Sequence, residues 1–109
     1  MNIEEIREYC ISKEEVSEGF PFDDVTLVFK VTNKMFAILS LDENPSRISL
    51  KCIPERALEL REKYDSIIPG YHLSKTHWNT ISLDGSVPDY LIRELIDLSY
   101  ELVRIVRKK

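Results

Sequence analysis

The fold is decided by RISLKC at residues 47–52, a stretch in which polar and apolar side chains alternate. A period of two places successive side chains on opposite faces of a strand, so Ile48 and Leu50 are expected to face a core. Two earlier runs, VTLVFKV at 25–31 and MFAILSL at 35–41, are also rich in the β-branched and aromatic residues that favour strands. Short polar turns separate the three runs, which predicts an antiparallel meander with one face on the core.

Three helices are expected around this sheet, over residues 3–12, 55–64 and 88–107. Asn2 followed by Glu5 matches a capping box, and Pro54 and Pro88 suit the first turn of a helix, where the missing N–H costs nothing. The last helix carries an apolar stripe at helical spacing that consists of Leu91, Leu95, Leu98 and Leu102. This stripe makes the last helix the expected main support of the sheet.

The remaining segments complete the expected order. Residues 13–18 form a charged connection, and residues 78–83 a further strand, with a short strand expected around Tyr71. The order α-β(3)-α-β(2)-α predicts one α+β domain over residues 1–109, with two layers. The helices are expected on one face of an antiparallel sheet, and the other face is expected to be at least partly open.

The composition is that of an ordinary soluble globular protein, with 43% hydrophobic and 31% charged residues. No apolar run approaches the ~18 residues of a membrane span, and no secretory leader is apparent, so a cytoplasmic protein is expected. Cys10 and Cys52 have apolar neighbours and are expected to be buried free thiols. The net charge of −4 argues against a generic polyanion binder, although the surplus of acids lies in the first 24 residues.

One segment, PGYHLSKTHWNT at residues 69–80, contains both histidines, the only tryptophan and a turn-forming Pro-Gly pair. It lacks a long period, so it is expected to be a loop that leads into a strand. Within it, Pro69, Gly70, Tyr71 and His72 are expected to be structural, with their polar groups satisfying the loop backbone.

Neither a metal site nor a cofactor is expected. His72 and His77 are five residues apart, which places them together on no helix or strand face, and no cysteine or carboxylate lies between them. The chain has no glycine-rich phosphate loop, nucleophile elbow or paired-cysteine motif. An enzyme is therefore not expected.

The same segment resembles the signature of the MmcQ/YjbR-like family of bacterial proteins, through PGYH at 69–72, Lys75 and HWNT at 77–80. The similarity extends over GFPF at 19–22, FA at 36–37, KC at 51–52, PERA at 54–57 and DGSVP at 84–88. One departure is Ile53, where a polar helix cap is expected. Another is SKT at 74–76, where the family more often reads Asn-Lys-Lys, so this chain has one positive charge fewer there. The resemblance implies a small α+β domain with a fold like that of type III secretion chaperones. It also implies DNA binding, by analogy with a double-wing transcription factor domain.

Cationic and aromatic residues are expected on the open sheet face, namely Lys30, Arg47, Lys51 and Trp78. The strand over 35–41 leaves two alternatives, because either Phe36 and Ile38 face outward or their neighbours do. Cations beside aromatic rings suit nucleic acid, since phosphates meet the charges and bases stack on the rings. The other interpretation is a solvated sheet face with Trp78 packed under the 69–77 loop.

Two functions follow from these patterns. In the first, the protein binds DNA weakly and in a salt-sensitive manner, and phosphates meet Lys30, Arg47, Lys51 and Lys75. In this hypothesis His77, Trp78 and Asn79 stack on bases or hydrogen-bond to them. In the second, the protein is a chaperone-like or adaptor module whose protein partner covers an apolar patch of Phe36, Ile38 and Trp78. A monomer or weak homodimer is expected, with no membrane partner.

Overall fold

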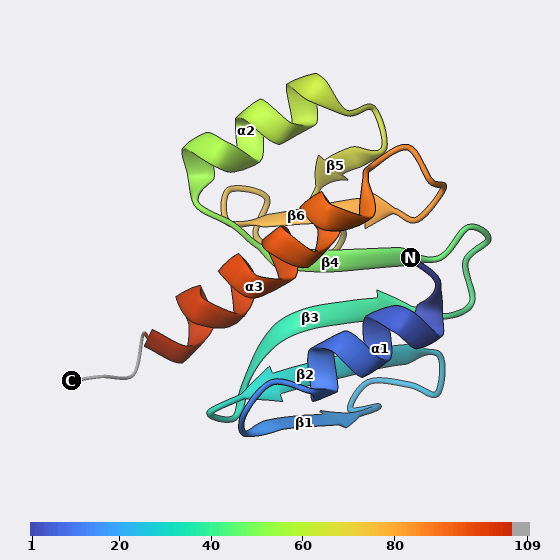
Figure 1. Ribbon diagram of the computed structural model, residues 1–109, viewed down its shortest axis with the longest axis vertical. Coiled ribbons are helices and arrows are strands. Elements are labelled where there is room, and N and C mark those ends of the chain that lie inside the picture. Colours follow the sequence, from blue (N-terminus) through green and yellow to red (C-terminus); the bar gives the residue numbers. More distant parts are fainter. Residues whose placement is uncertain (106–109) are drawn as a thin grey trace.

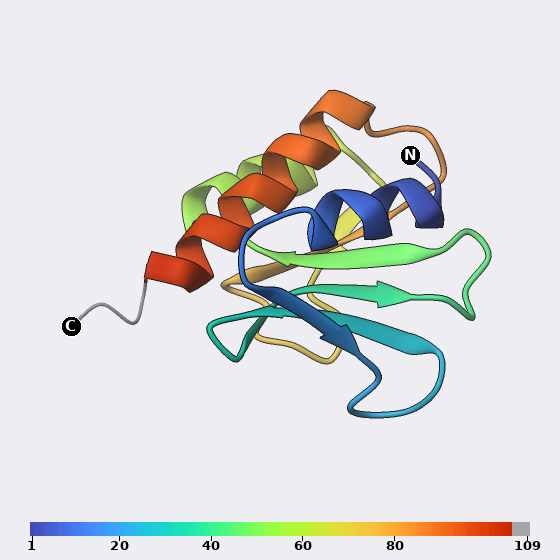
Figure 2. The same ribbon diagram turned by 60° about the horizontal axis from the view of Figure 1, so that its bottom comes forward.

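Six strands form one antiparallel sheet in the order β1-β2-β3-β4-β6-β5, and three helices lie on one of its faces (Figure 1). The strands are β1 (Val16–Gly19), β2 (Thr26–Val31), β3 (Lys34–Ser40), β4 (Arg47–Lys51), β5 (Ile67–Pro69) and β6 (Trp78–Ser82). The helices are α1 (Ile3–Ile11), α2 (Pro54–Lys63) and α3 (Asp89–Ile105). Figure 2 shows the layer of helices above the sheet, which confirms the predicted α+β class.

This computed structural model describes residues 1–105, so the last two residues of the helix predicted over 88–107 lie outside the described residues. Within this part of the chain, no helix combines the length and the apolar character that crossing a bilayer requires.

Strand β1 corrects the expectation of a charged connection over residues 13–18. It pairs antiparallel with β2, with Val16 opposite Val31. Its sequence, VSEG, contains a single apolar side chain, which is too few for alternation to be recognised. Pairing with the free edge of β2, and not local propensity, therefore makes this segment a strand.

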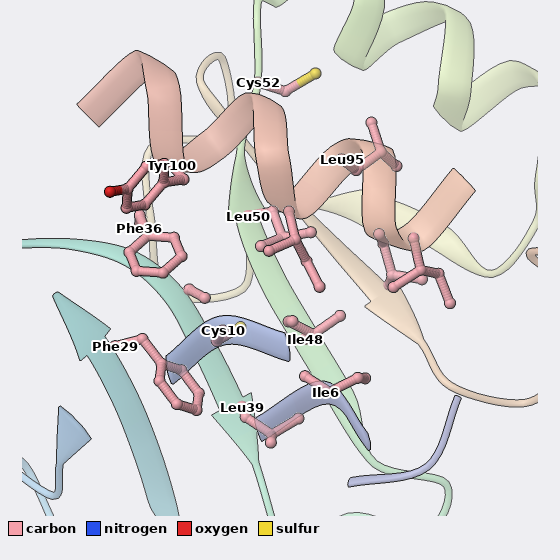
Figure 3. Packing of buried hydrophobic residues seen from close by; sticks show 14 of the residues in the cluster. Ile6, Cys10, Phe29, Phe36, Leu39, Ile48, Leu50, Cys52, Leu95 and Tyr100 are labelled. Atoms are coloured by element: carbon pink, nitrogen blue, oxygen red, sulfur yellow. The ribbon is translucent and has the colours of Figure 1, made fainter. Parts of the chain in front are cut away.

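A bulge in the pairing of β2 with β3 resolves the two alternatives for the second strand of the meander. The register shifts between Phe29 and Lys30. Because of this shift, Ala37 and Phe36 both face the core, and Phe36 is 0% exposed. Its ring packs edge-on against Tyr100 with centroids 5.4 Å apart (Figure 3). Phe36 therefore faces inward and Ile38 outward, so neither alternative holds for the whole strand.

Helix α3 crosses the sheet and buries apolar residues along most of its length (Figure 3). Its buried hydrophobic residues are Leu91, Ile92, Leu95, Ile96, Tyr100 and Val103. Leu98 and Leu102 of the predicted stripe are half-buried, because the buried face of the helix turns toward Ile96 and Tyr100. Each fully buried side chain of this size contributes about 2 kcal/mol, so α3 is a major support of the sheet.

A hydroxyl of α3 also joins the helix to two strands. The Oγ of Ser99 donates to the carbonyl of Phe36 at 2.6 Å and accepts the N–H of Lys51 at 2.9 Å. Regular pairing of β3 with β4 stops one residue earlier, at Ala37 and Leu50. Ser99 therefore satisfies two backbone groups that the bulge removes from the ladder.

The predicted helix starts and buried thiols are confirmed. Asn2 and Glu5 form the capping box of α1, and Pro54 occupies the first turn of α2. Cys10 and Cys52 are free and buried. Burial raises the pKa of Cys10 to about 12 and also raises the pKa of Cys52. Both side chains are therefore neutral thiols at ordinary pH.

Candidate functional site

The sheet face opposite the helices places polar side chains of β4 and β6 side by side. The facing pairs are Lys51 with Trp78, Ser49 with Thr80, and Arg47 with Ser82. Ile48 and Leu50 of the same strand lie in the core, as the alternation predicts. Lys51 and Arg47 mark the two ends of this outer face, about 13 Å apart along the strand.

The end near Lys51 carries several of the predicted nucleic-acid residues. We call it the basic end and define it as Lys30, Lys51, Lys75, His77 and Trp78. Lys30 lies opposite Met35, one pair beyond the bulge, at the end of the sheet where Lys51 meets Trp78. None of these three lysines forms an ion pair with another of residues 1–105. Their charges are therefore available to a ligand.

Arg47 lies at the opposite end and is already engaged. Its guanidinium forms an ion pair with Glu43 at 3.0 Å and lies over the ring of Tyr71, 5.2 Å from the ring centre. The carboxylate neutralises the charge that a phosphate would need. Arg47 is therefore not brought together with the lysines of the basic end.

Asn79 is placed on the helix side of the sheet, which corrects its predicted contact with bases. It is 3% exposed. Its side-chain oxygen accepts from Nε of Arg61 at 2.7 Å, and its amide donates to the carbonyl of Ala57 at 3.3 Å. The parity of β6 explains this, because Trp78 and Thr80 point outward and the residue between them points inward.

Arg61, on α2, is a residue that the sequence analysis missed. Besides Asn79, its guanidinium donates to the carbonyls of Lys75 and Trp78. It therefore fastens the 70–77 loop and the start of β6 to the helix layer. Its position in the last turn of a charged helix gave no local signal of this contact.

The loop before β6 closes tightly onto Trp78. The N–H of Gly70 donates to the carbonyl of Trp78 at 2.8 Å, and the N–H of Trp78 donates to the carbonyl of Ser74 at 3.0 Å. A Cβ added at Gly70 would lie 2.7 Å from the Cβ of Trp78. Nζ of Lys75 donates to the Gly70 carbonyl at 3.1 Å, so this lysine also closes the loop. Trp78 is half-buried as a result.

The other motif residues lie on or beside the outer face. Pro69 ends β5 opposite Asn79, and the N–H of Tyr71 donates to Oγ1 of Thr80 at 3.0 Å. The rings of Tyr71 and His72 are 4.0 Å apart, and both side chains are exposed. His72 has a φ of 60°, a left-handed conformation that non-glycine residues seldom adopt outside constrained sites.

Beside Tyr71 and His72, the outer face is hollowed. The hollow has a volume of about 380 Å³, and its lining runs along β3 from Met35 to Ser40 and includes Arg47. Among the residues around it are Phe22, Asp23, Ile38, Asp42, Glu43 and Tyr71. The hydroxyls of Ser49 and Thr80, 2.7 Å apart, lie at its floor. The sequence analysis missed this hollow, because segments far apart in the chain enclose it.

The apolar patch that motivated an interaction module is largely absent. Phe36 is buried in the core, and Ile38, although on the outer face, is 9% exposed. Trp78 is half-buried. The alternative of a protein-interaction module therefore loses the observation on which it rests.

Across residues 1–105, no three side chains from His, Cys, Asp and Glu come together as a metal site would require. The neutral thiols of Cys10 and Cys52 are also poor nucleophiles, because the thiolate is the reactive form.

A comparison with protein families identifies the family to which this chain is similar. The model of the family described as YjbR matches residues 11–102. The chain belongs to the YjbR family. The matched range includes the whole sheet and most of α3, so the YjbR family model covers the basic end and the hollow alike.

Similar proteins of the YjbR family come from several bacteria. The chain is 39% identical over 101 residues to the uncharacterised protein YjbR of Escherichia coli K12, covering 93% of this chain and 86% of that protein. It is 40% identical over 57 residues to the uncharacterised protein YyaQ of Bacillus subtilis, covering 52% of this chain and 48% of that protein. The Escherichia coli relative, matched over most of both chains, supports the family assignment, and the description of neither protein states an activity.

A solved structure supports the fold. The crystal structure of Deinococcus radiodurans protein DR2400, with the domain DUF419, matches with a TM-score of 0.90 at 45% identity. The match covers 98% of this chain and 80% of that one. A crystal structure from Pseudomonas syringae matches with a TM-score of 0.83 at 29% identity, covering 95% of this chain and all of the other.

Proposed function

We propose that this YjbR-family protein binds nucleic acid through the basic end of its outer sheet face, and that single-stranded DNA is the form it binds best. The observation that carries the proposal is the cross-strand pair of Lys51 and Trp78 on that face. A cation beside a half-exposed ring offers a phosphate contact and a stacking surface at neighbouring positions. Unpaired bases are free to stack on the ring, whereas the bases of a duplex already stack on one another.

Three lysines limit the strength of this interaction. Lys30, Lys51 and Lys75 have no carboxylate partner within residues 1–105, so the charge of each is left to replace a counterion on the strand, although Nζ of Lys75 also donates to the Gly70 carbonyl. For single strands the logarithm of affinity falls by about 0.7 per contacted phosphate with each tenfold increase in salt, so a slope of about −2 is expected. Stacking of one base on Trp78 adds about 1–3 kcal/mol. Binding is therefore expected to be weak and salt-sensitive.

The test is a titration with labelled single-stranded and double-stranded DNA at low and moderate salt, followed by fluorescence anisotropy. Trp78 is the only tryptophan, so quenching of its emission reports stacking directly. We expect single-stranded DNA to bind more tightly than the duplex and to quench Trp78.

A charge-matched pair of double variants separates a local effect from a general one. Lys30→Glu with Lys51→Glu is expected to remove binding. Lys63→Glu with Arg93→Glu changes the net charge equally at exposed helix positions and is expected to reduce binding much less. Absence of binding to every DNA at low salt, or equal losses in the two double variants, would sink the proposal.

A further inference from the structure

We propose that the hollow on the outer sheet face binds a small organic cation, an amine attached to an aromatic ring. The hollow measures about 380 Å³; its lining runs along β3 from Met35 to Ser40 and includes Arg47, but none of the basic-end residues. This volume falls within the range of about 300–1,000 Å³ that small-molecule sites occupy in proteins. The inference stands apart from the proposed nucleic-acid binding, because it uses none of the basic-end residues.

The rim of the hollow carries two exposed aromatic side chains, Phe22 and Tyr71, and the ring of Tyr71 also contacts Arg47 and His72. Phe22 is 65% exposed and Tyr71 is 55% exposed. Ile38, which is 9% exposed, also lines the hollow. Exposed rings around a concave surface gain free energy when an apolar or aromatic body covers them. A planar ring of the ligand therefore fits this part of the hollow.

The charges around the hollow are predominantly negative. Asp23, Asp42 and Glu43 line it, against the single guanidinium of Arg47, which is paired with Glu43. Asp23 accepts hydrogen bonds from the N–H groups of Val25 and Thr26, and these neutral donors leave its charge uncompensated. Asp42 forms no ion pair with any of residues 1–105. Two carboxylates therefore remain to attract a cation.

The floor of the hollow supplies a hydrogen-bond donor. Ser49 and Thr80 are 7% and 2% exposed, and their hydroxyls bond to each other. This bond uses one of their two hydroxyl hydrogens, and the N–H of Tyr71 occupies a lone pair of Thr80. The second hydroxyl hydrogen is left for an acceptor in the hollow. A ligand with an oxygen on its ring satisfies this donor while its ammonium group stays near the carboxylates.

The test uses tyramine as the probe, because it joins an ammonium group to a phenol ring. Its matched anion is 3-(4-hydroxyphenyl)propionate, which has nearly the same shape and a carboxylate in place of the ammonium group. Titrations of the full chain are followed by NMR of backbone amides. We expect tyramine to shift the signals of Phe22, Asp42, Tyr71 and Thr80, and to bind at least tenfold more tightly than the anion.

Asp42→Asn removes one free carboxylate at an exposed position and is expected to weaken tyramine binding at least threefold. Asp65→Asn, at an exposed position outside the hollow, is the matched control and is expected to leave it unchanged. Phenethylamine, which lacks the phenol oxygen, is expected to bind at least threefold more weakly than tyramine if the floor donor is used.

Several results would overturn the inference. These are an equal affinity for the anion, shifts confined to other surfaces, no binding at millimolar tyramine, and equal effects of the two Asp→Asn variants. Lys30→Glu with Lys51→Glu is expected to keep tyramine binding, so a failure of DNA binding and a failure of this site are distinguishable. Equal binding of phenethylamine and tyramine would refute the role assigned to the floor hydroxyls.

Discussion

Gly70 leaves no room for a side chain, because an added Cβ would lie 2.7 Å from the Cβ of Trp78. We expect Gly70→Ala to lower the free energy of unfolding by about 1–3 kcal/mol, since the loop or the tryptophan must move. Urea denaturation followed by Trp78 emission measures this. Gly19→Ala is the control, because nothing lies within 4 Å of a Cβ there. Equal stability of the two variants would show that the loop accommodates a Cβ at position 70 without a cost in free energy.

Asn79 stabilises the fold through Arg61 and the Ala57 carbonyl, and does not face the outer surface. Asn79→Ala is expected to lower the free energy of unfolding by about 1–3 kcal/mol, because it leaves buried hydrogen-bonding groups without partners. DNA affinity of the folded protein is expected to remain unchanged, as measured by anisotropy well below the melting temperature. A loss of DNA affinity without a loss of stability would instead indicate that Asn79 takes part in DNA binding.

At the scale of elements, alternation predicted the faces of β4 correctly, because that strand pairs regularly on both sides. It left β3 ambiguous, because the bulge that turns Phe36 inward depends on a register between two strands. Alternation missed β1, because its four residues form a strand only through their pairing with β2 and carry a single apolar side chain.

Part of the candidate site could also be predicted from the sequence, and part could not. Strand parity located Lys51 and Trp78 on one face, where the structure pairs them. It had no means to find the contacts of Arg61 with the 75–79 segment. The hollow was also out of reach, since it depends on how the 20–26 and 71–73 segments fold over the sheet.

The bridge from α3 to β3 and β4 gives an element-scale prediction. Ser99→Ala removes the hydroxyl that bonds the Phe36 carbonyl and the Lys51 N–H. We expect the free energy of unfolding to fall by about 1–3 kcal/mol, because both groups lose a buried partner. Ser17→Ala, on exposed β1, is the comparison and should change it by less than about 0.5 kcal/mol. Indistinguishable urea midpoints would show that the bridge adds nothing.

For the whole molecule, stability should decline on the alkaline side. Burial raises the pKa of Cys10 from 9.0 to about 12, and burial together with Asp97 raises that of Tyr9 to about 12. Both groups ionise earlier in the unfolded chain, so the stability they contribute is complete below pH 9 and is lost as pH rises toward 12. For the buried Cys10 the slope approaches about 1.4 kcal/mol per pH unit.

Urea denaturation between pH 7 and 11 measures this decline. Cys10→Ala is expected to flatten the slope above pH 9, even though the variant starts from a lower stability. A slope that does not change in the variant would show that the thiol is not shielded from water.

The opposite charges at the two ends of the outer face give that face an electric dipole directed along the strands. Lys30 and Lys51 form its positive pole, and Asp23 and Asp42 form its negative pole. In the field of a polyanion this dipole experiences a torque that turns the basic end forward before contact. Adding salt should therefore slow the association of DNA as well as weaken the complex, and Asp42→Asn should reduce the orienting torque while leaving every phosphate contact intact.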